Sequence, residues 1–180
     1  MKPYLEKLSS NVDLTFEEAI DAMQLIMSGE STSAQFGSFV TALRMKGETV
    51  DEIAGMASVM RKMSLSVNND ADLLDTCGTG GDGLGTFNIS TAAAFVSAGI
   101  GIKIAKHGNR AMSSNTGSAD VLESLGININ LTPGQVTECI KISNFGFMFA
   151  QRFHPAMKYA GPPRREIGIR TVFNILGPLT

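Results

Sequence analysis

Apolar residues in the first third of the chain recur at the spacing of amphipathic helices. The three sets are Phe16, Ile20, Met23, Ile26 and Met27; Phe36, Phe39, Val40 and Leu43; and Ile53, Met56, Ala57 and Met60. Before each set stands a Thr with Glu or Gln three residues later, the pattern of a capping box: Thr15 with Glu18, Thr32 with Gln35, and Thr49 with Glu52. Gly29 and Gly47 are placed to end helices. The pattern predicts a small all-α domain over residues 1–66, with its methionines in the core.

The pattern changes after a polar link at residues 66–70. Short apolar runs predict strands at residues 73–77, 102–105 and 147–150. Helices are predicted at residues 88–98, 118–125 and 164–176. A further helix is predicted to begin at the capping box of Thr132 and Gln135. This alternation indicates parallel strands joined by helices, hence an α/β domain over residues 67–180. Few strands are present for a covered parallel sheet, so we expect the α/β domain to be truncated.

Composition and charge exclude several classes of protein. With 43% hydrophobic residues and a formal net charge of −2, the chain can bury a core and has no overall attraction to nucleic acid or anionic membranes. No apolar run approaches the ~18 residues that cross a bilayer, and the N-terminus lacks a signal-peptide pattern, so we expect a cytoplasmic protein. Cys77 and Cys139 are too few for a metal cluster or a disulfide framework, and we expect both to be small buried residues.

A glycine-rich run follows the first predicted strand. Residues 78–83 read GTGGDG, and such glycines let backbone N–H groups approach a phosphate at the start of a helix. The run fits the dinucleotide-binding pattern, but that pattern needs an acidic residue after the next strand, where Lys106 and His107 stand. The mononucleotide P-loop fails because Leu84 follows Gly83. Two interpretations of this run remain: a phosphate-binding loop of another kind, or a glycine-rich turn that binds no ligand.

A second polar loop follows the next strand, with the sequence KHGNRAMSS over residues 106–114. The carboxyl ends of parallel strands meet at one edge of a sheet, so both loops should face one crevice. Two cations, an amide and several hydroxyls suit a ligand with several phosphates and sugar hydroxyls. Gly117 and Ser118 then open another helix. The alternative is a solvated basic turn.

Four runs in the chain resemble the anthranilate phosphoribosyltransferases of tryptophan biosynthesis. They are GTGGDGLGTFNIST, KHGNRAMSSNTGSADVLESLGI, HPAMKYAGPPRREIGIRT and FNILGPLT. The resemblance covers essentially the whole chain. It implies a helical domain joined to a larger α/β domain, a homodimer formed through the helical domains, Mg²⁺ as cofactor, and transfer of a phosphoribosyl group from phosphoribosyl pyrophosphate to anthranilate. A pyrimidine nucleoside phosphorylase relative and a non-catalytic dimerising fragment are the alternatives.

The same resemblance implies site residues. For phosphoribosyl pyrophosphate they are Gly78, Gly81, Asp82, Thr86, Asn88, Ser90, Thr91, Lys106, Ser114 and Ser118, with Ser90 also a magnesium ligand. For anthranilate they are Gly78, His107, Asn109, His154, Tyr159 and Arg164. No covalent nucleophile is expected, because an aromatic amine is itself nucleophilic. Arg164 is expected at a helix N-terminus, which is unfavourable for a cation and therefore suggests function.

Length is the one departure from the family pattern. Members of the family run to nearly twice this length, and their second magnesium site uses an Asp-Glu pair that would lie beyond Thr180. We therefore expect the chain to correspond to the N-terminal half of such an enzyme, inactive or weakly active alone.

Overall fold

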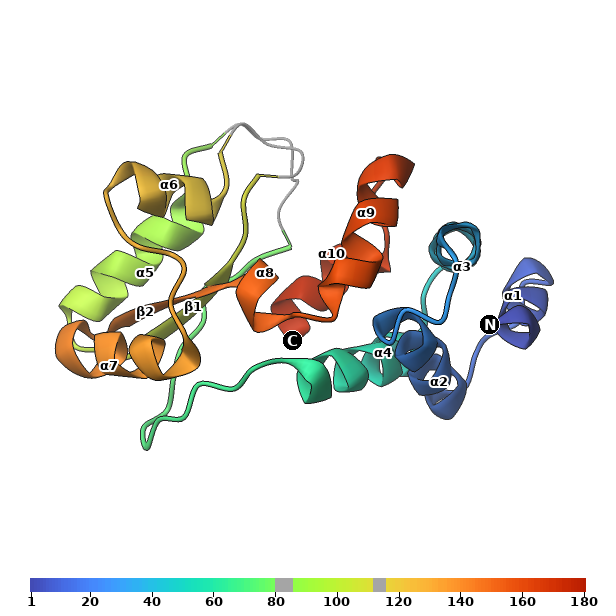
Figure 1. The fold of residues 1–180 in the computed structure, drawn as a ribbon, viewed down its shortest axis with the longest axis horizontal. Helices are drawn as coiled ribbons and strands as arrows, with labels where there is room; N and C mark the ends of the chain where they lie inside the picture. The colour runs from blue at the N-terminus through green and yellow to red at the C-terminus, as the bar shows by residue number, and fades with distance from the viewer. Residues whose placement is uncertain (80–85, 112–115) are drawn as a thin grey trace. The chain divides into compact units, whose positions relative to one another are not determined.

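The computed structural model describes residues 1–79, 86–111 and 116–180 and divides the chain into two compact units (Figure 1). The helical unit comprises Met1–Ser64 and His154–Thr180, and the α/β unit comprises Leu65–Phe153. Among the described residues, no helix combines the length and apolarity needed to cross a membrane.

The helical unit begins with four helices. They are α1 (Lys2–Ser9), α2 (Phe16–Met27), α3 (Ser33–Lys46) and α4 (Val50–Met63). Helix α1 was not predicted. It lacks a side-chain cap hydrogen bond, and Leu8 is its only buried residue. The predictions for α2, α3 and α4 are confirmed.

The three threonine capping boxes form as predicted. At the start of α2, the Glu18 backbone N–H donates to Thr15 Oγ1 at 3.2 Å, and the Thr15 N–H donates to Glu18 Oε2 at 3.0 Å. The other two boxes have the same reciprocal pattern. The predicted interior residues are buried, apart from Phe16, which is 37% exposed, and Ile20 and Ile53, which are half-buried.

The C-terminal segment of the chain forms α9 (Met157–Ile167), α10 (Val172–Leu176) and the 3-10 turn η1 (Gly177–Leu179). The single helix predicted at residues 164–176 is wrong. Gly168 ends α9 with φ of +67°, a left-handed conformation that glycine adopts without strain. Phe173 of α10 packs against Phe36 of α3, with ring centroids 5.4 Å apart. By its contacts, the segment from His154 onward therefore belongs with the helical unit. The predicted domain boundary between residues 66 and 67 stays a prediction.

The α/β unit is built on two parallel strands. Strand β1 (Ile104–Gly108) pairs with β2 (Phe145–Phe149), and Ile104, Lys106 and Gly108 lie opposite Phe145, Phe147 and Phe149. The helices are α5 (Ile89–Gly99), α6 (Ser118–Ser124), α7 (Pro133–Ser143) and the short α8 (Ala150–Phe153). The strand predictions at residues 102–105 and 147–150 find the right segments, but their ends differ from those of β1 and β2 by one to three residues.

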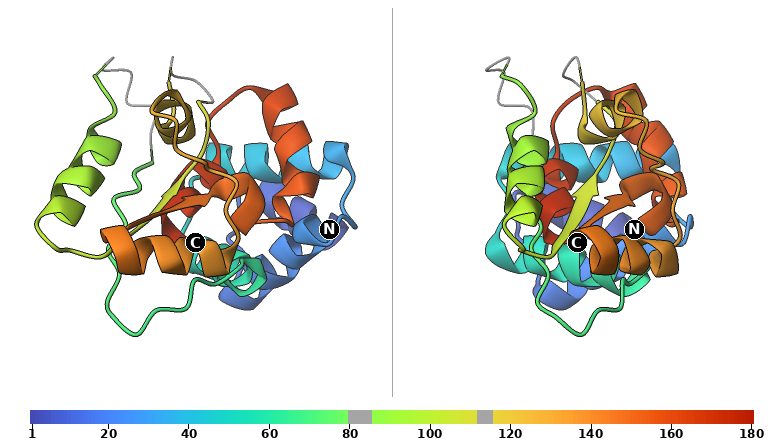
Figure 2. Two further views of the ribbon diagram at one scale, coloured as in Figure 1. Left: turned by 60° about the vertical axis from the view of Figure 1, so that its left-hand side comes forward. Right: turned by 90° about the vertical axis from the view of Figure 1, so that its left-hand side faces the viewer.

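Side chains alternate between two faces of these strands. Ile104 contacts Ala94 and Ala98 of α5, and Phe147 and Phe149 pack with Ala119 and Leu122 of α6. Ala105 packs with Val136 and Ile140 of α7 instead. Helices α5 and α7 thus cover opposite faces, as Figure 2 shows in its right-hand view. Lys106 shares the face of Ile104, and His107 shares the face of Ala105.

The predicted strand at residues 73–77 is reduced to one parallel bridge between Leu74 and Ile104. The Leu74 N–H donates to the Lys103 carbonyl, and the Ala105 N–H donates to the Leu74 carbonyl. A continued ladder would next use the His107 N–H. That N–H donates instead to Asp75 Oδ1 at 3.1 Å, so the Asp75 side chain replaces the ladder bond and the strand ends.

Candidate anion-binding site

Lys106 is the centre of the candidate site. Its side chain is fully buried, and its Nζ lies 3.3 Å from Thr76 Oγ1 and 3.2 Å from Ser90 Oγ. Among the residues that the structure describes, no carboxylate lies within ion-pair distance of this ammonium. Burial lowers the pKa of Lys106 below its ordinary value, partly offset by the charges of Asp75 and Cys77. A buried cation held only by hydroxyls is poised for an anionic ligand.

The first turn of α5 lies directly beside this lysine. Asn88 caps the helix, and its Oδ1 accepts from the Thr91 N–H at 3.1 Å and from the Ser90 hydroxyl at 3.3 Å. Thr76 Oγ1 donates to the Ser90 carbonyl at 2.8 Å. The unpaired N–H groups and the dipole of α5 add positive potential where Lys106 ends. The structure thus brings together Asn88, Ser90, Thr91 and Lys106, all predicted site residues.

Gly117 and Asp120 close the loop that leaves β1. Asp120 Oδ2 accepts from the Ala111 N–H at 2.9 Å and from the Gly117 N–H at 2.8 Å. A Cβ on Gly117 would lie 2.4 Å from the Ala111 nitrogen, so only glycine fits. The two ends of the segment after Asn109 are therefore tied together, and Ser118 is held half-buried at the start of α6.

Arg110, counted in the sequence analysis as a second ligand cation, has another role. Its guanidinium donates to Glu123 Oε1 at 2.8 Å and to Asp120 Oδ1 at 3.4 Å, and it lies 5.7 Å from the centroid of the Phe149 ring. The carboxylates of α6 pair with this charge, whereas Lys106 is the buried cation of β1. That Arg110 also serves a ligand stays a prediction.

The other predicted residues of this unit lie around these two loops. Gly78 is exposed, and a Cβ there would meet no other atom within 4 Å. Thr86 and Asn109 are exposed, whereas His107 is buried on the face of β1 opposite Lys106. Gly81, Asp82 and Ser114 lie outside the described residues.

Three residues predicted to bind anthranilate belong to the helical unit. Arg164 lies in the last turn of α9, not at a helix N-terminus, so the expectation of an unfavourable dipole position is wrong. Its guanidinium lies 5.1 Å from the centroid of the Phe173 ring, and burial lowers its pKa. Across the described residues, Arg164 has no carboxylate partner. Tyr159 is 43% exposed, and His154 is buried.

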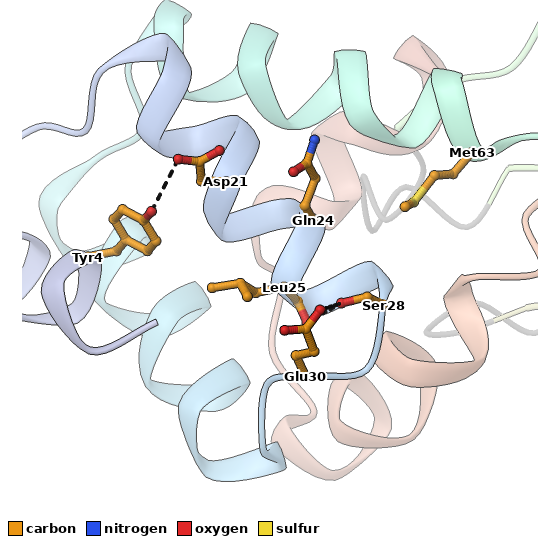
Figure 3. Close-up of a pocket in the computed structure, with 7 residues that line it drawn as sticks. All are labelled: Tyr4, Asp21, Gln24, Leu25, Ser28, Glu30 and Met63. Carbon is orange, nitrogen blue, oxygen red and sulfur yellow. Dashed lines mark hydrogen bonds between the residues drawn. The ribbon is translucent and has the colours of Figure 1, made fainter.

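A pocket of about 490 Å³ lies elsewhere in the helical unit, as Figure 3 shows. It is lined by Tyr4, Asp21, Gln24, Leu25, Ser28, Glu30 and Met63. Tyr4 donates to Asp21 at 3.4 Å, and Ser28 donates to Glu30 at 2.8 Å. Two carboxylates among its lining residues make this pocket unsuitable for a phosphate-bearing ligand.

Two residues near the site were missed in the sequence analysis. Thr76 positions both Lys106 and Ser90, and Asp75 ends the bridge beside β1. The alternation of side chains along a strand could have indicated Thr76. This residue lies beside β1, two positions before Gly78, where its side chain can share the face of Lys106. The cysteines also differ from expectation in their burial, since Cys77 and Cys139 are half-buried.

Two family models match the chain in succession. Residues 2–64 match the helical bundle domain of a glycosyl transferase family, and residues 70–180 match its a/b domain. The fold is therefore that of a glycosyl transferase that combines a helical bundle with an α/β domain. The chain belongs to this glycosyl transferase family.

The chain is similar to anthranilate phosphoribosyltransferases of several organisms. It is 65% identical over 168 residues to the anthranilate phosphoribosyltransferase of Chloroflexus aurantiacus, and the match covers 93% of this chain and 50% of that protein. The crystal structure of anthranilate phosphoribosyltransferase from Thermus thermophilus matches with a TM-score of 0.91 and 47% identity over 98% of this chain and 54% of that one. This chain spans about half the length of these relatives.

The anthranilate phosphoribosyltransferase of Saccharomyces cerevisiae, solved in complex with PRPP and Mg, matches with a TM-score of 0.88 and 35% identity. This match covers 98% of the present chain and 53% of the yeast chain. The yeast protein is also known in complex with 4-fluoroanthranilate.

Proposed function

We propose that this chain is the N-terminal half of an anthranilate phosphoribosyltransferase and carries its binding site for phosphoribosyl pyrophosphate. The observation that carries the proposal is Lys106, a fully buried cation whose ammonium contacts only hydroxyls among the described residues. The family and the names of the relatives agree with a phosphate-bearing sugar as the ligand.

The pyrophosphate group would bind where Lys106 meets the first turn of α5. The ammonium would supply charge, and the backbone and side chains of Asn88 to Thr91 would supply further donors. Two loops would border the same ligand. The glycine-rich loop would contribute Gly78, Gly81, Asp82 and Thr86, and the second loop would contribute Ser114 and Ser118.

Ser90 fits the proposed magnesium site as a minor ligand. Its hydroxyl oxygen accepts from Lys106 and donates to Asn88, which leaves a second lone pair for a cation. One neutral oxygen is a small share of the six that Mg²⁺ prefers, so substrate phosphates and water would supply most of the others. When bound, Mg²⁺ would neutralise charge on the pyrophosphate.

Anthranilate is the proposed second substrate. Arg164, which lacks a carboxylate partner among the described residues, suits the carboxylate of the substrate. The other residues that the family resemblance implies for anthranilate are Gly78, His107, Asn109, His154 and Tyr159. These assignments follow the family resemblance residue by residue.

The reaction would be a displacement at the anomeric carbon of the ribose. A C–N bond forms from the anthranilate amine as the C–O bond to pyrophosphate breaks, and the amine then loses one proton. Lys106 would stabilise the charge on the departing pyrophosphate, while the two binding sites would hold the reactants in line. No covalent nucleophile is needed.

We also propose that the protein is a cytoplasmic homodimer that pairs through its helical unit. Val50, Ile53, Ala54 and Ala57 line an apolar groove of about 480 Å³ on α4, together with Leu179. Met45 and Val50 are each more than 80% exposed. Apolar surface of this kind suits a subunit interface. Analytical ultracentrifugation of the chain tests the pairing: a monomer at all concentrations would exclude it.

Transferase activity is best tested after the second half is restored. A chimera of this chain with the remaining half of the Chloroflexus aurantiacus relative should consume anthranilate, followed by loss of its fluorescence, only when phosphoribosyl pyrophosphate and Mg²⁺ are present. The Lys106→Met chimera should lose the activity, and the Lys103→Met chimera should keep it. Phosphate-dependent cleavage of a pyrimidine nucleoside, without consumption of anthranilate, would contradict the proposal.

A further inference from the structure

We propose that Asp75, Cys77 and His107 form a binding site for a thiophilic divalent cation of the zinc class. Each of the three offers one ligand atom, and these atoms all lie within 4.8 Å of one another. The trio is distinct from the proposed magnesium site, because its donors are sulfur, nitrogen and carboxylate oxygen.

Backbone hydrogen bonds explain why these three side chains meet. The segment that holds Leu74 runs parallel to β1 at one bridge, and Asp75 follows directly after it. The Cys77 N–H donates to Asp75 Oδ1, a turn closed by the aspartate side chain, and the His107 N–H of β1 donates to the same oxygen. The Thr76 hydroxyl contacts Lys106, whereas the ligand atoms of Asp75, Cys77 and His107 lie together.

Asp75 holds the other two residues in place. Its Oδ1 accepts from the backbone N–H of Cys77 at 2.9 Å and from the backbone N–H of His107 at 3.1 Å. This one oxygen therefore fixes the two residues that carry the sulfur and the imidazole. Both of these bonds are made by Oδ1, and Oδ2 is the second oxygen that the carboxylate can offer to a cation.

The donor set selects the kind of metal. Zn²⁺ is bound in proteins by thiolate, imidazole and carboxylate, and ligand atoms about 3.5 Å apart follow from its tetrahedral bond lengths. The ligand atoms of the present trio lie within 4.8 Å of one another, so metal binding would draw them closer together. Mg²⁺ and Ca²⁺ prefer oxygen ligands and are disfavoured. Three protein ligands leave a fourth position for water or a ligand.

The charges around the trio set its affinity. Lys106 lies close enough to interact electrostatically with both Asp75 and Cys77. Its positive charge favours the thiolate but opposes a divalent cation. A histidine that ligates a metal through one ring nitrogen commonly holds the other in a hydrogen bond, so other contacts of His107 are compatible with the site.

The test is a titration of the reduced, metal-free chain with Co²⁺, which replaces Zn²⁺ and gives a thiolate-to-metal charge-transfer absorption in the near ultraviolet. Wild-type chain and Cys139→Ser, the matched control at the other cysteine, should both show the band. Cys77→Ser should abolish it. Zn²⁺ should displace the Co²⁺, whereas Mg²⁺ should not.

A second variant guards against loss of folding. Asp75→Asn keeps an oxygen that can accept from both backbone N–H groups but removes the charge, so it should retain native far-ultraviolet circular dichroism while binding Co²⁺ at least about 10-fold more weakly. No band in the wild type, or a band that survives Cys77→Ser, would overturn the proposal. The titration uses no substrate, so its outcome is independent of the proposed transferase activity.

Discussion

The ammonium of Lys106 and the hydroxyl of Ser90, 3.2 Å apart, join the end of β1 to the first turn of α5. A lysine that is fully buried and lacks a described carboxylate partner carries a desolvation cost in the free protein. An anionic ligand would offset that cost at the point where a helix N-terminus adds its own positive potential.

Replacing this lysine should stabilise the free protein while removing its function. In Lys106→Met, the apolar side chain fills similar space without a buried charge, so the free energy of unfolding should rise by about 1–3 kcal/mol. Urea denaturation measures this, and affinity for phosphoribosyl pyrophosphate should fall at least about 100-fold in the same variant. Lys103→Met, on the same stretch of chain but half-buried, is the control and should change neither quantity appreciably. A less stable Lys106→Met with unchanged affinity would contradict this role.

The lowered pKa of Lys106 should make the affinity for phosphoribosyl pyrophosphate depend on pH. Below that pKa the lysine is charged in both states, and its burial costs stability in full. As the pH rises from the folded-state pKa towards the unfolded value near 10.5, the unfolded chain holds the extra proton, so stability rises. Ligand affinity should change in the opposite sense and weaken over the same range. Calorimetric titrations of phosphoribosyl pyrophosphate between neutral and alkaline pH measure it. The Lys106→Met variant should not show this loss of affinity with rising pH. If its affinity falls at alkaline pH as much as that of the wild type, another group is responsible.

The cap of α5 should matter for both stability and binding. Asn88→Ala removes the acceptor for the Thr91 N–H and the Ser90 hydroxyl and should cost about 1 kcal/mol of unfolding free energy. Thr132→Ala removes a comparable cap from α7 and should cost a similar amount. Affinity for phosphoribosyl pyrophosphate should weaken in Asn88→Ala but not in Thr132→Ala. Equal affinities in the two variants would place the ligand elsewhere.

Gly117 should not tolerate a side chain. A methyl group there would meet the Ala111 nitrogen at 2.4 Å and the Asn109 carbonyl oxygen at 2.6 Å, both backbone atoms. Gly117→Ala should therefore cost about 1–3 kcal/mol. Gly134→Ala in α7 meets no atom within 4 Å and should be neutral or slightly stabilising. Thermal unfolding distinguishes them, and equal midpoints would show that the loop after β1 yields to the added group.

Local signals in the sequence predicted much of the fold. A capping box is a contact between residues three apart, so Thr15, Thr32, Thr49 and Thr132 could be placed without tertiary information. Asn88 was likewise expected at the start of a helix and caps α5. The buried faces of α2, α3 and α4 followed from their helical period.

Features that depend on distant partners could not be predicted. Asp75 ends a predicted strand because it bonds to His107, which lies far along the chain. Arg110 is engaged by Glu123 of α6, so its charge could not be assigned to a ligand from the loop sequence alone. Pairing across elements, and not local propensity, decides the positions of Asp75 and Arg110. Arg164 was misplaced for a local reason, because Gly168, which ends α9, was taken as the interior of a helix.

The most direct test of the central claim is calorimetric titration of this chain with phosphoribosyl pyrophosphate and Mg²⁺. The account predicts saturable binding at one site per chain, competition by inorganic pyrophosphate, loss of binding in Lys106→Met and its retention in Lys103→Met. Absence of binding by the folded wild-type chain, or equal binding by Lys106→Met, would contradict it.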